Sequence, residues 1–173
     1  MADEPRTRTV VFGLGSNLGE RLDNLQGALD GLFEAPDMKR VVVSPVYETK
    51  PMGGPPQPYY LNIVVLAETM LEGTAVLERA QGVEEALHRL REVRWGPRPI
   101  DVDIVALGEE RSTEPELTLP HPRAHERAFV LRPWADVAPE STLPGHGRVA
   151  DLVTAVADQE IQRRDDLALR VPG

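Results

Sequence analysis

The sequence predicts an α+β fold, and the order of its first elements, βαββαβ, is that of a ferredoxin-like α/β sandwich. Short apolar runs rich in β-branched residues indicate the strands, and longer stretches with helical periodicity indicate the helices. The second and third strands follow one another without a helix between them, which is not the order of a doubly wound parallel sheet. From Ser112 onward, the residues predict short C-terminal additions.

The first strand and the first helix differ in the spacing of their apolar residues. Residues 10–14 form a short apolar run that ends in a Gly-Ser-Asn turn at residues 15–17, as expected of a buried strand. Over residues 20–34 the apolar positions recur at helical spacing, which predicts an amphipathic helix. Pro36 marks the end of this helix, because proline cannot continue it.

Two strands separated by a loop follow the first helix. Residues 40–47 are rich in valine and predict the second strand, and residues 60–68 predict the third. Between them, residues 49–58 contain four prolines and two glycines. This segment cannot join a regular hydrogen-bonded ladder, so we expect an irregular loop.

A second helix and a fourth strand complete the predicted order. The helix starts near Thr74, and residues 100–107 predict the strand. The buried face of the helix is expected to carry Val76, Leu77, Ala80, Val83, Leu87 and Leu90. Residues 148–157 predict a small packing helix. We find no linker, so we expect one domain over residues 1–173 with a flexible tail at residues 1–8.

Composition and charge restrict the class of protein. With 41% hydrophobic and 27% charged residues, the chain has the composition of a soluble globular protein. The absence of cysteine excludes disulfides and thiolate metal sites. The first residues lack the apolar segment of a signal peptide, so we expect a cytoplasmic protein. The formal net charge of −9 disfavours general binding to nucleic acid or to an anionic membrane.

Arginines nevertheless gather in two short stretches of this acidic chain. The first comprises Arg89, Arg91, Arg94 and Arg98, and the second comprises Arg123, Arg127 and Arg132. Such groups either hold a small polyanion or form a solvated surface. Their clustering alone leaves both interpretations open.

Two aspartates alternate along the predicted fourth strand. Since alternate side chains of a strand point to the same face, Asp101 and Asp103 share one face, and Val102 and Ile104 share the other. Neighbouring carboxylates repel each other unless a cation lies between them. Such oxygen ligands suit Mg²⁺, which leaves room for phosphate oxygens. A bare Asp-x-Asp is also compatible with a solvated strand face.

The segment in front of these aspartates makes the pattern specific. Residues 94–104 read Arg-Trp-Gly-Pro-Arg-Pro-Ile-Asp-Val-Asp-Ile, so two arginines flank a Gly-Pro turn directly before two carboxylates. A phosphate chain with bound Mg²⁺ would explain this arrangement. The segment closely resembles the signature of the hydroxymethyldihydropterin pyrophosphokinase family, in which threonine usually stands at the position of Pro99.

Further segments resemble the same family in the same order. They are residues 15–18, residues 47–53 with residues 57–62, Gln81 with Glu84, and Leu-Pro-His-Pro-Arg at residues 119–123 with Arg127 and Phe129. The resemblance covers residues 10–139 and implies the same ferredoxin-like fold that the element order predicts.

The resemblance implies a role for each matching residue. Asp101 and Asp103 would ligate two Mg²⁺ ions, and the residues implied in catalysis are Arg89, Arg91, Arg98, Asp101 and Asp103. Those implied to bind ATP are Gln81, Glu84, Trp95, Arg98, Ile104, Thr118, His121 and Arg127. Those implied to bind the pterin are Thr49, Met52, Gly53, Tyr60, Asn62, Trp95 and Phe129, with the ring lying flat between Tyr60 and Phe129.

The implied reaction is pyrophosphoryl transfer in folate biosynthesis. The hydroxymethyl oxygen of 6-hydroxymethyl-7,8-dihydropterin would attack the β-phosphorus of ATP, and AMP would leave without a protein nucleophile. The implied partners are these two small molecules, with no nucleic acid and no membrane. The family commonly works as a monomer.

Three other interpretations fit fewer residues. Gly13, Gly15 and Gly19 resemble a dinucleotide-binding turn, but the third glycine comes one residue late and the element order does not continue as βαβαβ. His121 and His125 would share one face of a helix and could hold zinc, but no third and fourth ligand is evident. A non-catalytic protein of the same fold that binds Mg·ATP and pterin is the remaining alternative.

Overall fold

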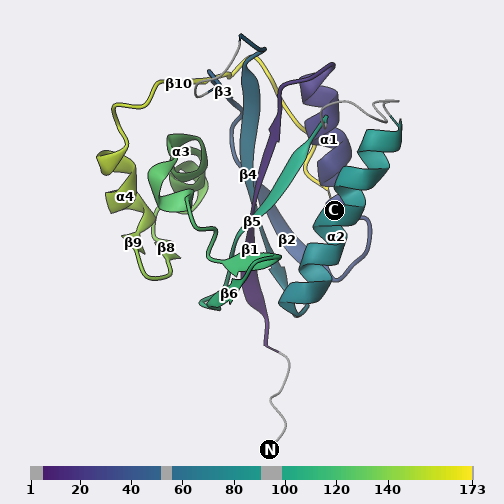
Figure 1. The fold of residues 1–173 in the computed structure, drawn as a ribbon, viewed down its shortest axis with the longest axis vertical. Coiled ribbons are helices and arrows are strands. Elements are labelled where there is room, and N and C mark those ends of the chain that lie inside the picture. Colours follow the sequence, from purple (N-terminus) through teal and green to yellow (C-terminus); the bar gives the residue numbers. More distant parts are fainter. Residues whose placement is uncertain (1–5, 52–55, 91–98, 173) are drawn as a thin grey trace, which may run out of the picture.

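A central antiparallel sheet, with helices on both faces, organises the computed structural model, which describes residues 6–51, 56–90 and 99–172 (Figure 1). The strands of the sheet are β1 (Arg8–Ser16), β2 (Met38–Val43), β3 (Tyr47–Thr49), β4 (Tyr60–Thr69), β5 (Asp101–Leu107) and β10 (Ile161–Arg163). The helices are α1 (Arg21–Leu32), α2 (Gly73–Leu90), α3 (Ala128–Val137), α4 (Val149–Ala155) and the short 3₁₀ helix η1 (Ala124–Glu126). Two hairpins, β6 (Ser112–Glu114) with β7 (Leu117–Leu119) and β8 (Thr142–Leu143) with β9 (Gly147–Arg148), complete the described elements. The predicted α+β class is therefore confirmed.

The sheet runs in the order β10–β3–β4–β1–β5, and β2 also pairs with β4. All of these pairings are antiparallel. The sequence predicted a single strand over residues 40–47, and this prediction is wrong because β2 ends at Val43 and β3 begins at Tyr47. Pro45 lies between them and has no N–H for a ladder, so the run divides there.

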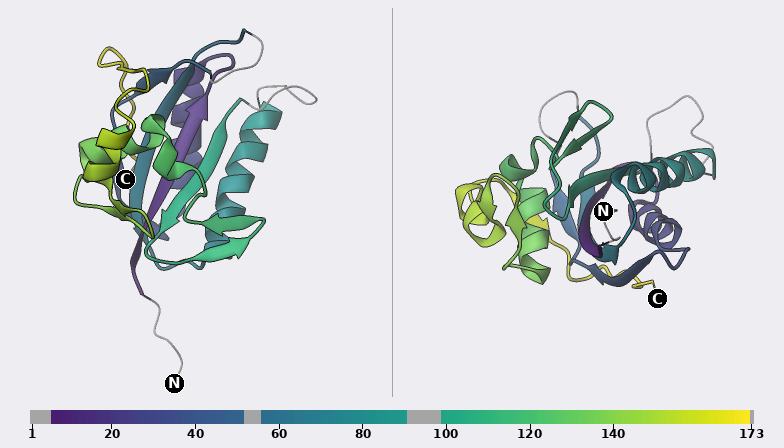
Figure 2. Two further views of the ribbon diagram at one scale, coloured as in Figure 1. Left: turned by 60° about the vertical axis from the view of Figure 1, so that its left-hand side comes forward. Right: turned by 90° about the horizontal axis from the view of Figure 1, so that it is seen from below.

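Each face of the sheet covers its own apolar core. Leu61, Ile63 and Val65 of β4 point into the core under α1 and α2. Val64 and Leu66, at alternate positions, point into the core under α3 and α4. This alternation is the period of a strand buried on both faces. The right-hand view of Figure 2 shows the two helical layers on opposite sides of the sheet.

The ends of the chain attach to the sheet in different ways. β1 starts at Arg8, inside the segment that we expected to be a tail, because Arg8 pairs with Thr69 and its guanidinium lies 2.5 Å from Glu110. At the other end, Gln26 of α1 exchanges two hydrogen bonds with the backbone of Arg170. The C-terminal residues thus cross from the α3 face to the α1 face. No helix within residues 6–51, 56–90 and 99–172 is long and apolar enough to cross a membrane.

Candidate functional site

A cavity of about 750 Å³ opens on the face of the sheet that α3 covers. Strands β1, β4 and β5 form its floor, and the η1–α3 segment with the start of β10 forms its wall. It brings together eight of the residues singled out from the sequence. These are Thr49, Tyr60, Asn62, Asp101, Asp103, His121, Arg127 and Phe129.

The two aspartates occupy the floor as the strand period predicts. Asp101 and Asp103 are exposed and line the cavity, whereas Val102 and Ile104 are buried beneath them. On the neighbouring strand, Gly15 pairs with Asp101 and Gly13 with Asp103. Because these glycines have no side chains, β1 places no side chain of its own beside the carboxylates, and Asn62 and Tyr60 approach the backbone at Gly15. Two adjacent carboxylates facing a large cavity form a suitable donor set for a divalent cation.

The Gly-Ser-Asn turn at the end of β1 forms hydrogen bonds with two segments that border the cavity. Ser16 Oγ donates to the carbonyl of Pro99 at 2.6 Å, and Asn24 Nδ2 donates to the same oxygen at 3.2 Å. Asn17 Nδ2 donates to Gln57 Oε1 at 3.0 Å. The turn therefore fixes both the residue that precedes β5 and the segment that leads into β4. Pro99, where the family usually has threonine, uses only its backbone carbonyl in these contacts.

A polar pair and a tyrosine border the cavity on β3 and β4. Asn62 Nδ2 donates to Thr49 Oγ1 at 2.8 Å, and both side chains are buried. This bond fixes the amide orientation, with Asn62 Oδ1 left as an acceptor. Burial, and to a lesser degree the charge of Asp101, raises the pKa of Tyr60, so its hydroxyl stays protonated at neutral pH.

His121 is held through its backbone and through its ring. Its backbone N–H donates to the carbonyl of Val105 at 2.8 Å, and its ring Nδ1 accepts from the backbone N–H of Arg123 at 3.2 Å. The neutral ring therefore carries its proton on Nε2. Burial lowers the pKa of His121, and the nearby Arg127 and Arg123 act in the same direction, while Asp103 opposes them. At neutral pH the residue is a neutral hydrogen-bond donor.

Arg127 and Phe129 lie where η1 passes into α3. Arg127 ends η1 and precedes the first residue of α3, with an extended backbone at φ −116° and ψ 113°. Its guanidinium carbon lies 5.4 Å from the ring centroid of Phe129, a cation–π distance. A positive group and an aromatic face thus enter the cavity from one short segment.

Some predicted residues do not reach the cavity. Among the described residues these are Gln81, Glu84, Arg89, Ile104 and Thr118. Ile104 packs in the core under α1 and α2, and Glu84 Oε2 accepts from the N–H of Val102 at 2.9 Å, which joins α2 to β5. Thr118 donates to the carbonyl of Glu114 within the β6–β7 hairpin. Met52, Gly53, Arg91, Trp95 and Arg98 lie outside the described residues.

Other residues line the cavity without having been singled out as site residues. They include Gly13, Gly15, Arg123, Glu126, Gln159 and Glu160. Arg123 belongs to the second arginine group, and the two glycines lie at the end of the first apolar run, where Gly15 begins the Gly-Ser-Asn turn. All three residues therefore carried a weak local signal. Gln159 and Glu160 carried none, because they follow α4 and reach the cavity only through the fold.

The proposed pair of zinc ligands is not supported. Residues 121–123 are not helical, since η1 begins at Ala124, so His121 and His125 do not share a helix face. The ring of His125 instead stacks on His146 at 3.9 Å between centroids. Within the part of the chain that the structure describes, no group of three or more His, Cys, Asp or Glu residues could hold a metal.

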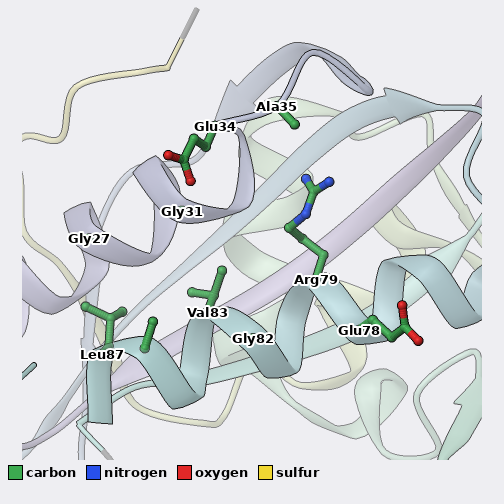
Figure 3. A pocket seen from close by; sticks show the side chains of 10 residues that line it. Gly27, Gly31, Glu34, Ala35, Glu78, Arg79, Gly82, Val83 and Leu87 are labelled. Atoms are coloured by element: carbon green, nitrogen blue, oxygen red, sulfur yellow. The ribbon is translucent and has the colours of Figure 1, made fainter. Parts of the chain in front are cut away.

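A second hollow, of about 520 Å³, lies between α1 and α2 on the other side of the sheet (Figure 3). Its lining includes Gly27, Gly31 and Gly82, with the charged side chains of Glu34 and Arg79. None of the site residues predicted from the sequence lines it. The chemistry expected from the sequence therefore belongs to the cavity on the α3 face.

Comparison with known proteins agrees with the site. Residues 11–139 match the family model of 7,8-dihydro-6-hydroxymethylpterin-pyrophosphokinase (HPPK). The chain belongs to this family. It is 39% identical over 154 residues to a 2-amino-4-hydroxy-6-hydroxymethyldihydropteridine pyrophosphokinase of Pseudomonas aeruginosa, covering 89% of this chain and 95% of that one. It is 41% identical over 173 residues to the protein of the same name from Mycobacterium tuberculosis, strain H37Rv, covering 94% and 90%.

Solved structures of HPPK proteins share the fold. The crystal structure of Plasmodium falciparum HPPK-DHPS wild type with SDX-DHP matches with a TM-score of 0.69 and 15% identity over 91% of this chain. The A437G form with SDX-DHP matches with a TM-score of 0.71 and 16% identity. The chain spans about half the length of these longer proteins, 46% and 47%. At these identities the likeness concerns the fold alone.

Proposed function

We propose that this protein transfers pyrophosphate from Mg·ATP to the hydroxymethyl group of 6-hydroxymethyl-7,8-dihydropterin and releases AMP, a step of folate biosynthesis. Besides membership of the family, one structural observation supports this proposal. A single cavity joins two carboxylates, a neutral histidine and an arginine to an aromatic and amide surface. The carboxylates, the histidine and the arginine suit a metal-bound triphosphate. The aromatic and amide surface suits a flat heterocycle with a polar edge.

The carboxylates fit the metal that accompanies ATP. Mg²⁺ is usually held by one or two carboxylates together with phosphate oxygens and water. Asp101 and Asp103, side by side on the cavity floor, offer that set, and we propose that they hold two ions with the nucleotide. When bound, the ions would neutralise charge on the phosphate chain.

The residues of the wall are proposed to bind the phosphates. His121 can donate from Nε2, because Nδ1 already accepts from the Arg123 N–H. Arg127 adds a permanent positive charge. The His121 ring is fixed by the Arg123 N–H, and the Arg127 guanidinium lies over the Phe129 ring. Both groups would act mainly by positioning the β-phosphorus for in-line attack and by balancing negative charge.

The pterin is proposed to bind between Tyr60 and Phe129, with Asn62 and Thr49 at its polar edge. Stacking on two aromatic faces favours a flat ring. The Asn62–Thr49 bond pre-orients the amide, so little ordering is needed on binding. A site built from such fixed buried groups discriminates strongly against ligands that lack the matching donors and acceptors.

The remaining proposed contacts rest on the family resemblance. They comprise Gln81, Glu84, Trp95, Arg98, Ile104 and Thr118 for ATP, Arg89, Arg91 and Arg98 for catalysis, and Met52, Gly53 and Trp95 for the pterin. We further propose that the pairing order β2–β4–β1–β5 corresponds to the ferredoxin-like arrangement, and that the chain is a single-domain, monomeric, cytoplasmic enzyme.

The experiment that tests this function follows the nucleotide product. Purified protein is incubated with 6-hydroxymethyl-7,8-dihydropterin, ATP and Mg²⁺, and we expect AMP and the pterin pyrophosphate in equal amounts. ADP as the product would mean transfer of a single phosphoryl group. Binding of both ligands without turnover would favour the non-catalytic alternative.

A variant pair tests the metal assignment. Asp103→Asn preserves the shape of the side chain but removes its charge, so we expect turnover to fall by about 10²- to 10³-fold with the fold retained. Glu109→Gln removes a carboxylate just beyond β5 and outside the cavity, and it should leave turnover unchanged. Near-normal activity of Asp103→Asn with Mg²⁺ would contradict the assignment.

A further inference from the structure

The side chain of Gln159, in the C-terminal part of the chain, forms hydrogen bonds with the backbone on both sides of Arg127. Gln159 Nε2 donates to the carbonyl of Glu126 at 2.7 Å, and Gln159 Oε1 accepts from the N–H of Ala128 at 3.0 Å. The carboxamide thus bonds to the residue before and the residue after the arginine. Gln159 itself lines the cavity. It lies outside residues 11–139, the part that matches the family model.

The two bonds add to those of Arg127 itself, whose backbone N–H and carbonyl are both hydrogen-bonded near the η1–α3 junction. Arg127 has the extended conformation that separates η1 from α3, and its side chain makes no capping hydrogen bond. The N–H of Ala128 is one of the first donors of α3, which have no acceptor within the helix. Gln159 supplies that acceptor from another segment. Without it, the Ala128 N–H and the Glu126 carbonyl lose these partners, and the junction that directs the Arg127 side chain is less firmly held.

The backbone around Gln159 is tied to α4 on one side and to the sheet on the other. The backbone N–H of Gln159 donates to the carbonyl of Val156 at the end of α4, at 3.1 Å. Two residues later, Ile161 begins β10 and pairs with Thr49 of β3 (Figure 1). Gln159 is therefore connected to the sheet that also carries the proposed pterin contacts. It can fix the wall of the cavity relative to the floor of the cavity.

We propose that Gln159 is a positioning residue, which holds Arg127 in the orientation that binds the phosphates of ATP. The inference rests on the proposed function, since it needs Arg127 to contact the nucleotide. It also assigns a role in the site to the C-terminal additions. A residue that only capped α3 would stabilise the fold without changing the affinity of the folded protein for nucleotide, and this difference can be measured.

The test is a double-mutant cycle on nucleotide affinity. The dissociation constant for α,β-methylene-ATP with Mg²⁺ is measured by calorimetry on the full chain, wild type and variants, with the thermal midpoint of each recorded. Gln159→Met keeps the shape of the side chain and removes both hydrogen bonds, and we expect it to weaken binding about tenfold. Gln159→Glu keeps the acceptor but loses the donor, and it should not restore the affinity. Gln162→Ala, an exposed glutamine on β10, is the matched control and should stay within twofold of wild type.

The decisive measurement is the same change in an Arg127→Ala background. If Gln159 acts through Arg127, Gln159→Met should then change the affinity by less than twofold. A tenfold loss that persists in this background, or wild-type affinity for Gln159→Met alone, overturns the proposal. If Gln159→Met does not fold, Gln159→Glu and Gln159→Ala replace it in the cycle.

The result also separates this inference from the proposed function. A wild type that binds the analogue but forms no AMP refutes the proposed reaction and leaves the coupling between residues 159 and 127 measurable. A wild type that forms AMP, with independent effects at the two residues, refutes only the positioning role. A wild type that does not bind the analogue refutes both.

Discussion

Adding one methyl group at Gly15 tests how tightly the cavity floor is built. A Cβ at this position would lie 2.7 Å from Asn62 Oδ1 and 3.6 Å from Tyr60 Cδ1. Ordinary contact begins at 3.4 Å, so the amide oxygen must retreat by about 0.7 Å, the difference between the two distances. Asn62 is buried and bonded to Thr49, so it cannot move without straining or losing that bond.

The cost follows from these contacts. Loss of the Asn62–Thr49 bond would leave a buried polar group unsatisfied, which costs about 1–3 kcal/mol, and overpacking adds strain of about 1–3 kcal/mol. We therefore expect Gly15→Ala to lower the free energy of unfolding by about 2–6 kcal/mol in a urea titration. Because Asn62 is the proposed contact for the polar edge of the pterin, the dissociation constant for pterin should rise about tenfold or more.

Gly13→Ala is the matched control on the same strand and the same face. Its Cβ would lie 3.5 Å from Val105 Cγ2, an ordinary van der Waals contact. The free energy of unfolding should then change by no more than about 0.5 kcal/mol. Equal stability of the two variants would refute the reasoning, because it would show that Asn62 is free to move.

Three further predictions concern stability. Gly82→Ala should raise the free energy of unfolding by about 0.5–1 kcal/mol in urea, since Gly82 is exposed inside α2 and an added Cβ meets nothing within 4 Å. Burial and a hydrogen bond to Asp136 raise the pKa of Tyr47 to about 12, above its value of about 10 in the unfolded chain. From pH 10 to 12 the unfolded state therefore releases its proton first, and wild type should lose about 1–2 kcal/mol of stability relative to Tyr47→Phe in denaturant titrations at each pH. Partial desolvation and the neighbouring His125 lower the pKa of the exposed His146 below 6.5, so the unfolded state binds more protons and stability should fall as the pH drops below that value. His146→Phe, which can keep the stack, should remove part of that fall in thermal melts between pH 7.5 and 5.5.

Local periodicity predicted most of the fold. β1, α1, β4, α2 and β5 occur where the apolar spacing placed them, because each buries a face whose period is visible within one segment. The division between β2 and β3 is not predicted by apolar spacing, because the valine-rich run continues up to Pro45 and only the missing N–H of that proline interrupts the ladder. The pairing of β10 with β3 was not predictable, since a strand of three residues carries almost no pattern.

The candidate site was predictable to the extent that its residues share local patterns. Asp101 and Asp103 needed only strand alternation to be assigned to one face. Glu84 shows the limit of this reasoning, because its carboxylate binds the N–H of Val102, and no spacing in the sequence indicates that contact. Backbone partners of side chains depend on how two elements meet, and this is decided by packing.

The position of the C-terminal additions explains why the cavity has a wall at all. β1, β4 and β5 offer a floor of carboxylates, glycines and an amide, but a sheet face alone cannot surround a ligand. η1 and α3 bring Arg127 and Phe129 over this floor from one short junction. Gln159 joins that junction to α4, and β10 joins the same segment to β3, so floor and wall become one connected structure. Gln159 and β10, which match no catalytic sequence pattern, would in this way determine how accurately Arg127 and Phe129 are positioned over the floor of the cavity.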